Sequence, residues 1–328
     1  MILKFQPEDF KVKEVLDLKF DEKGNYIYFL LKKKNWTTMK ALNELSKRTK
    51  CNDFGYAGLK DYAGITEQFV SCLRKYENML KRVKIKDISI KILGYGTKQI
   101  GLGMLEGNDF DIIVRGLKKS ADVPDEFVNY FGQQRFGGEF RANTHLVGKY
   151  LMKRDYEKAF FEYVLRDYET ETKDHREFRR KLREKLDFKI IPRYLINEIS
   201  VVRIFTETKD YKKAMLSLPK RLLTLFLQAY QAYLFNLYLK IKVADEVEVL
   251  GFDSKPDEIY TNLLKKEGIE LKDFKTEFYN LHAGKREGIV KVTKLKVYPF
   301  KGSSQRFRFF LPKGSYATVF LEQVFEST

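Results

Sequence analysis

The sequence predicts an α+β fold, in which a mixed sheet forms a core and a mostly helical domain is inserted before the last elements of that core. Three observations support this prediction. Strand-like runs recur between residues 26 and 117, and helical periodicity dominates from about residue 148 to residue 241. Strand signals then return, and the chain closes with a further strand and a further helix.

The first part of the core begins with a clear strand pattern. Residues 26–31 (YIYFLL) are apolar and aromatic, which is typical of a buried strand. Thr37 or Thr38 can cap a following helix, in which apolar residues such as Leu42 and Leu45 recur at helical spacing. Three more segments have strand character, at residues 65–73, 86–96 and 110–117.

The helical part follows. We expect residues 125–135 (DEFVNYFGQQR) to form a short helix with an acidic first turn. Longer helical stretches lie at residues 150–168, 176–188 and 218–241. Residues 306–312 (RFRFFLP) then predict a strand, and Ser315 can cap a last helix. We expect the core to comprise residues 1–148 and 292–328, and the inserted helical domain to comprise residues 149–291.

The composition indicates a globular protein with a polyanionic partner. Hydrophobic residues make up 44% of the 328 residues, which is ample for a packed core. The formal charge of +17 comes from basic residues spread along the whole chain, which favours a folded basic face over a disordered arm. Nucleic acid is the leading candidate partner, and an anionic membrane surface is the second.

Signals for export, membrane insertion and disulfide formation are absent from the sequence. The N-terminus MILKFQPEDF lacks the pattern of a signal peptide, and no apolar run reaches the ~18 residues of a membrane span. Cys51 and Cys72 do not form a CxxC pair. We expect a soluble, cytoplasmic protein that does not enter the membrane and that acts as a monomer, since no interface signal stands out.

Sequence signatures of cofactor and metal chemistry are absent as well. The sequence has no GxxxxGK[ST], HExxH or GxSxG motif, and GLGMLEG misses the GxGxxG pattern by one position. His145, His175 and His282 lie far apart without metal-ligand spacing. We therefore expect no metal and no small-molecule cofactor, so that any catalysis has to use carboxylates, lysines and aromatic side chains.

The segment FGYAGLKDYAGITEQ (54–68) places one carboxylate, Asp61, among small residues. Glycines on both sides let a ligand approach the backbone closely, and a carboxylate can act as a covalent nucleophile on a sugar or base. Such a nucleophile has to be ionised, which a nearby cation favours. A solvated turn is the alternative, because Asp and Gly commonly form turns.

A second segment, NYFGQQRFGG (129–138), combines two phenylalanines with an arginine. Aromatic faces and guanidinium planes stack on unpaired bases, so this composition suits RNA binding. The alternative is a helix end whose Phe131 and Phe136 enter the core, which composition alone favours.

Taken together, these segments resemble one family, the TruD-type pseudouridine synthases. FGYAGLKDYAGITEQ is similar to the catalytic motif of that family, and NYFGQQRFG followed by Asn143 is similar to its second motif. QAYLFNLYL, around Phe235 and Asn236, is similar to the third. Further similar segments are LKFQPEDFKVKE (3–14), GLGMLEGNDFDIIVR (101–115) and LPKGSYAT (311–318).

The resemblance implies a fold, a reaction and a set of site residues. The fold is a pseudouridine-synthase catalytic core with a mixed, mainly antiparallel sheet and an inserted, mostly helical TRUD domain. The reaction is the isomerisation of uridine to pseudouridine in tRNA, at position 13 of the D arm, without a cofactor. The implied catalytic residues are Asp61, Lys4, Phe131 and Asn129. The implied substrate-binding residues are Gly58, Lys60, Tyr56, Gln134, Arg135 and Phe136.

Two other functions stay open at this point. One is a catalytically silent RNA-binding protein or RNA chaperone on the same fold, against which the intact Lys60–Asp61 pair argues. The other is a membrane-surface protein, which the basic helix at 176–188 suggests. The acidic residues interleaved in that helix make a solvated face the more natural interpretation.

Overall fold

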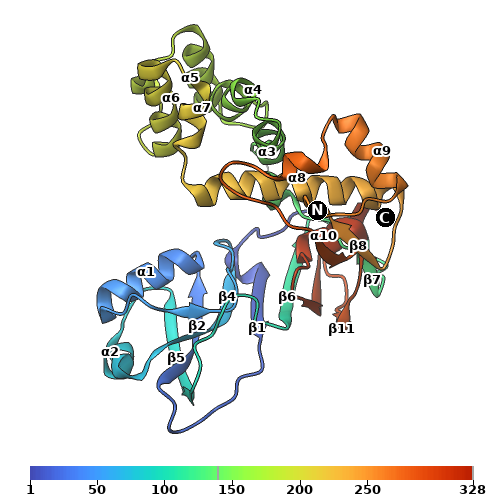
Figure 1. Cartoon of the computed structure of the whole chain (residues 1–328). Helices are drawn as coiled ribbons and strands as arrows, with labels where there is room; N and C mark the ends of the chain where they lie inside the picture. Colours follow the sequence, from blue (N-terminus) through green and yellow to red (C-terminus); the bar gives the residue numbers. More distant parts are fainter. Residues whose placement is uncertain (139, 327–328) are drawn as a thin grey trace. The chain divides into compact units, whose positions relative to one another are not determined.

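The computed structural model describes residues 1–138 and 140–326, and the chain forms two compact units (Figure 1). Unit 1 comprises Met1–Phe127 and Val290–Thr328, and unit 2 comprises Val128–Ile289. The boundaries of these units differ from the expected domain boundaries at residues 128–148, which belong to unit 2. The reason is that the helix beginning at Thr144 packs against the long helix of unit 2.

Unit 1 is built on a mixed sheet, which has eight strands within the described residues. The strand order is β11-β12-β6-β1-β4-β2-β5, with β3 paired to β4. β1 and β4 run parallel, whereas the other pairs are antiparallel. The predicted fold class is thereby confirmed. The strands are β1 (Phe10–Val15), β2 (Tyr26–Lys34), β3 (Gly55–Tyr56), β4 (Ile65–Leu73), β5 (Ile88–Gly96), β6 (Gly107–Arg115), β11 (Thr293–Val297) and β12 (Ser304–Pro312).

Alternation along the strands gives this sheet a covered face and an open face. In β1, Phe10 and Val12 are buried, whereas Lys11 and Lys13 are exposed. α1 (Thr38–Thr49) covers the buried face beside β2 and β4, with which it shares a hydrophobic core. The loop of residues 57–64 lies on the side of α1, since the N–H of Lys60 donates to Thr38 at the start of that helix.

Both predicted helices of unit 1 form, but only the first is capped as expected, because α10 begins two residues after Ser315 and the buried hydroxyl of Ser315 makes no hydrogen bond within the described part of the chain. The Thr37 hydroxyl accepts a hydrogen bond from the backbone N–H of Lys40 and so caps α1. α10 (Ala317–Glu326) follows β12, and its Phe320 packs edge-on against Phe309 of that strand. The smaller elements of unit 1 are η1 (Pro7–Asp9), η2 (Arg74–Tyr76) and α2 (Glu77–Arg82).

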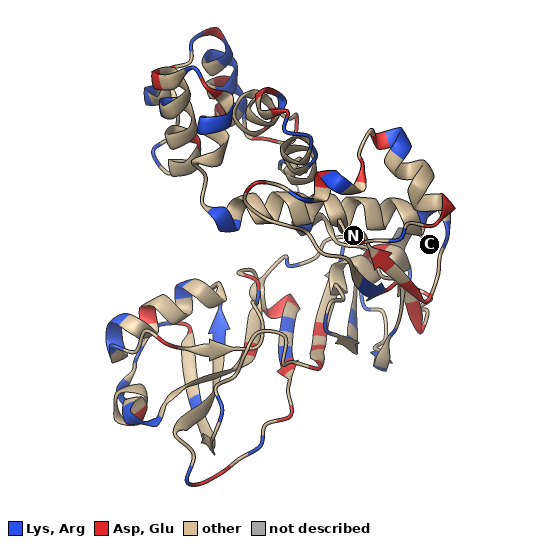
Figure 2. Ribbon diagram, viewed as in Figure 1, with Lys and Arg blue, Asp and Glu red and all other residues tan. Residues whose placement is uncertain are grey.

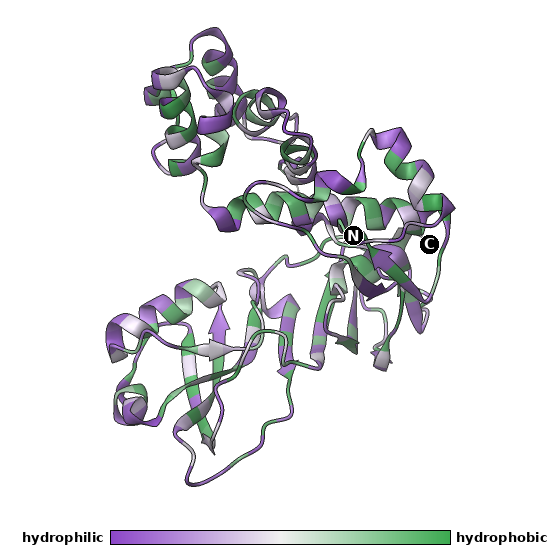
Figure 3. Cartoon of the chain, in the orientation of Figure 1, coloured by the Kyte–Doolittle hydropathy of each residue, from purple (hydrophilic) through white to green (hydrophobic). Residues whose placement is uncertain are grey.

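Unit 2 is mostly helical and is organised around α8 (Lys220–Ile241), which confirms the long helix predicted at 218–241. α8 contributes many side chains to one large core, and Figure 3 shows hydrophobic residues over much of its length. The other elements of unit 2 are η3 (Gln133–Phe136), α3 (Thr144–Met152), α4 (Tyr156–Phe160), the π-helical turn η4 (Phe161–Leu165), α5 (Lys173–Glu184), η5 (Phe188–Ile190), α6 (Ile196–Thr208), α7 (Tyr211–Leu216), β8 (Glu246–Val249), α9 (Glu258–Glu267), η6 (Leu271–Phe274) and β9 (Gly284–Glu287).

α3 approaches α8 so closely that only glycine fits at position 148. A Cβ atom on Gly148 would lie 2.0 Å from the carbonyl oxygen of Phe226. Although alanine at an open helical site gains up to about 1 kcal/mol over glycine, we expect Gly148→Ala to lower the free energy of unfolding by about 1–3 kcal/mol. Thermal or urea denaturation followed by circular dichroism measures this. Asn262→Ala, at an exposed position of α9, is the control, and a more stable Gly148→Ala protein would contradict the prediction.

Two expectations about helices were wrong in detail. Residues 125–135 do not form a helix, because Glu126–Val128 form the strand β7, which pairs with β10 (Ile289–Lys291), and Gln133–Phe136 form only a 3₁₀ turn. The stretch 150–168 is not one helix either, since the chain breaks after Met152 and Arg154 adopts a left-handed conformation with φ of 55°. In the first case pairing with a distant strand outweighs local helical preference.

Within the described part of the chain, none of the helices has the length and the apolar composition needed to cross a membrane.

Candidate active site

Asp61 lies in unit 1, in the loop of residues 57–64 that connects β3 to β4. We call this segment the Asp61 loop. It has no helix or strand of its own, so contacts with neighbouring elements have to define its conformation. The side chain of Asp61 is 41% exposed, which leaves the carboxylate accessible to a substrate.

Lys4 lies beside Asp61. Its Nζ atom is 3.3 Å from Oδ2 of Asp61 and 4.5 Å from the centroid of the Phe10 ring. The backbone of Lys4 is left-handed, with φ of 58°. The ammonium therefore balances the carboxylate charge while its position is fixed by an aromatic face. The fold thus brings together two of the predicted catalytic residues.

The segment that carries Lys4 is anchored to β6 through Arg115. The guanidinium of Arg115 donates two hydrogen bonds to the buried carboxylate of Asp9, at 2.7 and 2.8 Å, and Ile2 exchanges two backbone hydrogen bonds with Arg115. The hydrogen bond from Arg115 lowers the pKa of Asp9, although burial opposes this. The stabilisation is therefore present above the unfolded pKa of about 3.9 and is lost as the pH falls through the lower folded pKa.

We expect Arg115→Met to lower the free energy of unfolding by about 2–4 kcal/mol at pH 7, because it leaves Asp9 buried without its charged partner. The difference from the wild type shrinks in strong acid, where Asp9 is protonated in both proteins. Urea denaturation across the pH range measures this. Arg82→Met, at the exposed end of α2, is the control, and a pH-independent difference would argue against the ion pair as its source.

Lys60 does not point into solvent. Its Nζ atom lies 2.7 Å from Oε1 of Glu14, and the two side chains are only 6% and 0% exposed. The other oxygen of Glu14 accepts a hydrogen bond from the backbone N–H of Phe69. This buried ion pair ties the Asp61 loop to β1 and β4. The expectation that Lys60 contacts substrate is thus not supported by its position, whereas a role in holding the loop is.

Two polar side chains fix the backbone of the Asp61 loop from neighbouring elements. The hydroxyl of Thr38 accepts from the N–H of Lys60 at 2.8 Å and donates to the side chain of Gln68 at 2.7 Å. Gln68 in turn donates to the carbonyl of Gly58 at 3.2 Å. Sequence reasoning missed these residues and Glu14. A signal was available for Glu14 and Gln68, because each is a polar residue at an inward position of a strand, where an apolar residue is usual.

The glycines of the loop differ in what they do. Gly64 has φ of 131°, and a Cβ there would lie 2.4 Å from the carbonyl oxygen of Phe10, so glycine is required. A Cβ on Gly58 would make only ordinary contacts, at 3.7 Å from Leu105 and from Nζ of Lys60. Tyr56 lies on β3, with its hydroxyl 3.4 Å from the sulfur of Met39. Gly58 and Tyr56 are thus close to Asp61 in sequence and lie on the same part of unit 1.

Asn129 is buried in unit 2 and its side chain is engaged there. Its Nδ2 donates to the carbonyl of Glu287 at 2.9 Å, and its Oδ1 accepts from Arg286 at 3.0 Å. Its backbone N–H donates to Gly288. These contacts give Asn129 a clear part in fixing the segment that leads to Phe131.

Phe131 is partly buried and its backbone is clamped by α8. Asn236 accepts from the N–H of Phe131 at 2.8 Å and donates to its carbonyl at 2.9 Å. The Phe131 ring packs edge-on against Phe235, and the guanidinium of Arg286 lies 3.8 Å from its centroid. The second and third sequence motifs therefore meet in space, 105 residues apart along the chain.

The remaining predicted residues of unit 2 form the turn η3. Gln134 is exposed, Arg135 lies 5.7 Å from the centroid of Phe131, and Phe136 packs edge-on against His145. The predicted residues thus fall into two groups. Lys4, Tyr56, Gly58, Lys60 and Asp61 belong to unit 1, and Asn129, Phe131, Gln134, Arg135 and Phe136 belong to unit 2.

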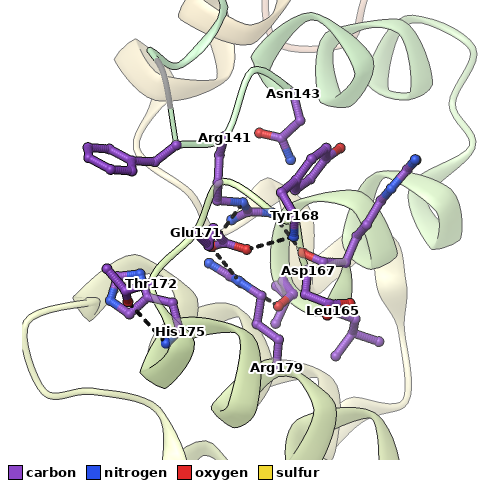
Figure 4. A network of polar contacts seen from close by, with 12 residues as sticks. Arg141, Asn143, Leu165, Asp167, Tyr168, Glu171, Thr172, His175 and Arg179 are labelled. Atoms are coloured by element: carbon purple, nitrogen blue, oxygen red, sulfur yellow. Dashed lines mark hydrogen bonds and ion pairs between the residues drawn. The ribbon is translucent and has the colours of Figure 1, made fainter.

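A buried polar network supports the end of the second motif (Figure 4). Asn143 donates to the carbonyl and to the carboxylate of Glu162, and Arg141 donates to the carbonyls of Glu162 and Tyr163. Figure 4 shows Arg179 reaching Glu171, and the distance between Nε and Oε1 is 3.0 Å. Because the side-chain amide of Asn143 is held by Glu162, we interpret Asn143 as a structural residue of this motif.

The chain carries many basic residues, whereas its described part has no evident metal site. Figure 2 shows Lys and Arg residues distributed over both units, as expected from the sequence. Among residues 1–138 and 140–326, no group of three or more His, Cys, Asp or Glu side chains is placed to hold a metal ion. The chemistry that the arrangement around Asp61 offers is that of an accessible carboxylate with an ammonium partner.

Comparisons with known proteins agree with one another over nearly the whole chain. The family model described as tRNA pseudouridine synthase D (TruD) matches residues 1–251 and 249–324. The chain is 32% identical to the tRNA pseudouridine synthase D of Aquifex aeolicus, an alignment that covers 98% of this chain and 97% of that protein. The chain belongs to the tRNA pseudouridine synthase D (TruD) family. It is also 34% identical to the probable tRNA pseudouridine synthase D of Methanococcus vannielii, over 97% of this chain and 93% of that protein.

A solved structure supports the same assignment to the TruD family. The putative tRNA pseudouridine synthase D of Methanosarcina mazei has a TM-score of 0.77 to this chain at 26% identity, and the match covers 99% of this chain and 93% of the other. The resemblance identified in the sequence is therefore confirmed.

The structure also explains why two other TruD-like segments belong together. Gly107 and Asn108, from GLGMLEGNDFDIIVR, pair with Pro312 and Leu311, from LPKGSYAT, where β6 meets β12. A Cβ on Gly107 would lie 2.2 Å from the carbonyl oxygen of Leu311, so these two segments are in close backbone contact. They form the half of the sheet on which α10 packs.

Unit 1 has a further groove, on the open face of its sheet. Its volume is about 490 Å³, and it contains no predicted site residue. Its charged lining residues are Lys11, Lys13, Lys32, Glu67, Asp109, Asp111, Lys294, Lys296 and Arg308. Several of these are paired with one another, for example Arg308 with Asp111 at 2.9 Å. This groove is therefore distinct from the surroundings of Asp61, which lie on the side of α1.

Proposed function

We propose that this protein isomerises uridine to pseudouridine in tRNA, at position 13 of the D arm, with Asp61 as the nucleophile. The observation that carries the proposal is the accessible Asp61 carboxylate with Lys4 at 3.3 Å, in the segment that is similar to the catalytic motif of the family. The names of the relatives support tRNA as the substrate. We further propose that unit 1 is the catalytic domain and unit 2 the inserted domain.

The reaction requires that the target uridine leave its base stack, because a protein carboxylate cannot reach a stacked nucleotide. Asp61 then attacks C1′ of the ribose, or the reaction begins with abstraction of a sugar proton. In both routes the bond between C1′ and N1 breaks, the base rotates, and a bond between C1′ and C5 forms. The proton lost from C5 is balanced by the one gained at N1. Lys4 balances the charge of Asp61 before the attack and again when the free carboxylate is restored.

Phe131 and Asn129 have supporting parts in this proposal. The partly exposed ring of Phe131 is proposed to stack on an unpaired base of the RNA, and the guanidinium of Arg286, which lies against this ring, adds a planar surface that is cationic. Asn129 holds the segment before Phe131 through its contacts with Arg286 and Glu287. Because isomerisation changes neither the composition nor the oxidation state of the substrate, we propose that the enzyme uses no cofactor. We keep the monomer as the proposed state, since the sequence has no clear interface signal.

The net charge of +17 supports binding to the phosphate backbone. Neutralisation of phosphates by Lys and Arg releases counterions, so the affinity for tRNA is expected to fall steeply with salt. Acidic residues are interspersed with the basic ones in both units, as Figure 2 shows.

The test is incubation of the protein with unmodified tRNA transcripts, followed by mapping of pseudouridine with carbodiimide chemistry. We expect one modified uridine, at position 13. A transcript with cytidine at that position is the control and stays unmodified. Modification at another site would contradict the assignment of the position, and tight binding without any conversion would instead support the silent RNA-binding protein.

A further inference from the structure

Lys33 is a buried lysine on the strand next to the Asp61 loop. It is near the end of β2, where alternation turns its side chain to the face covered by α1, and it is only 1% exposed. Leu31, two residues earlier on the same face, is the kind of residue such a position ordinarily carries. A lysine here therefore calls for an explanation.

The ammonium of Lys33 contacts backbone carbonyls. Its Nζ atom donates to the carbonyl of Trp36 at 2.5 Å and to that of Asp61 at 3.1 Å, and the carbonyl of Lys60 lies at 3.5 Å. Three N–H groups thus face three carbonyl oxygens, which matches the hydrogen-bonding capacity of an ammonium. Two of these oxygens belong to the Asp61 loop, and the third belongs to the turn before α1.

The other contacts of the Asp61 loop act on either side of its central residue. Thr38 and Gln68 hold the backbone at Lys60 and Gly58, and the N–H of Asn35 donates to the carbonyl of Gly64. Lys33 reaches Asp61 itself. It therefore links the backbone that carries the carboxylate to the rigid sheet.

We propose that Lys33 is a positioning residue, whose ammonium fixes the backbone of Lys60 and Asp61 and thereby the direction of the Asp61 carboxylate. This inference rests on the proposed role of Asp61 as the nucleophile. Lys33 is buried and does not touch the substrate. Its effect is therefore expected in the rate of the chemical step and not in RNA affinity.

Burial makes the charged form of Lys33 unfavourable, and a charge kept under such conditions supports a functional reason for the presence of this lysine. Burial lowers the pKa of Lys33 to about 8, the carboxylate of Asp61 opposes this decrease, and the ammonium of Lys60 adds to it. Lys33 is therefore charged at neutral pH and loses its proton as the pH rises through about 8. The neutral amine keeps two donors for three carbonyls. We expect the kcat of the wild type to decline above that pH.

The first experiment compares Lys33→Met with Lys32→Met. Lys32 is the neighbouring residue on the open face of the sheet, so its substitution controls for the loss of one positive charge from β2. We expect Lys33→Met to lower kcat by about 10- to 100-fold with KM within about 3-fold, and to lose the alkaline decline. Wild-type kcat in Lys33→Met, or an unchanged alkaline decline, would overturn the inference.

A second measurement does not depend on catalysis. Hydrogen–deuterium exchange of peptides covering residues 57–64 is expected to be faster in Lys33→Met and in Lys33→Ala than in the wild type. Propylamine, which replaces the missing part of the side chain, is expected to slow the exchange of Lys33→Ala and to restore part of its kcat. Unchanged exchange in both variants would overturn the inference. If the wild type forms no pseudouridine, the proposed function fails, and faster exchange still supports the structural part.

Discussion

Asp61→Asn is expected to form no measurable pseudouridine in tRNA, a loss in kcat of at least about 10⁴-fold. Asparagine keeps the shape of the side chain but has no charge and is a poor nucleophile. The carboxylate is accessible, and Lys4 lies at 3.3 Å, so the substitution removes the group on which the proposed chemistry depends. Affinity for tRNA is expected to stay within about 3-fold, because the phosphate contacts come from other residues.

The measurement is single-turnover conversion with enzyme in excess over labelled tRNA. Asp17→Asn, at an exposed position between β1 and β2, is the matched control and is expected to be as active as the wild type. Asp61→Ala accompanies Asp61→Asn, since slow deamidation of asparagine would regenerate the carboxylate. Full activity of the alanine variant would show that the nucleophile is a different residue.

Lys4→Met is expected to lower kcat by about 10²-fold, which corresponds to about 2.7 kcal/mol of transition-state stabilisation. The ammonium of Lys4 contacts the carboxylate of Asp61 and is held over the ring of Phe10. Methionine keeps roughly the length of the side chain and loses the charge, so the contact between the Lys4 ammonium and the Asp61 carboxylate is lost while the packing changes little. The KM for tRNA is expected to stay within about 3-fold.

Lys19→Met, an exposed position in the same unit, is the control for the loss of one positive charge. Kinetics at several tRNA concentrations separate kcat from KM. If Lys4→Met raises KM and keeps kcat, Lys4 is a phosphate contact and does not serve Asp61. A loss of stability would appear in the urea denaturation curve, which has to be measured for the same sample.

Much of the fold could be predicted because its signals are local. β2, α1, β12 and α10 follow from apolar periodicity and from capping residues such as Thr37, which act within a few positions of the chain. α8 is buried around much of its surface, and that also shows as a long apolar pattern. Elements with such patterns are formed mainly by their own residues.

Other elements could not be predicted, because partners far along the chain decide them. Residues 126–128 form a strand only because β10, more than 150 residues later, pairs with them. The break after Met152 depends on how α3 and α4 pack, and the acidic and aromatic residues around it read as a continuous helix. The free-energy difference between helix and strand that arises from local propensity is smaller than the free energy of such tertiary contacts.

The sequence by itself determined the family, the sheet-and-helix class and Asp61 as the residue to test, since these depend on residue types in order along the chain. The tertiary structure decided what surrounds Asp61. Lys4 contacts the carboxylate of Asp61 from 57 positions away along the chain, and Lys60 turns inward to Glu14, which is 46 positions away. Lys33 donates to the backbone carbonyl of Asp61 from strand β2. These contacts do not show in any local sequence pattern. A buried charge is tolerated only where the fold supplies its partners, and those partners come from distant parts of the chain.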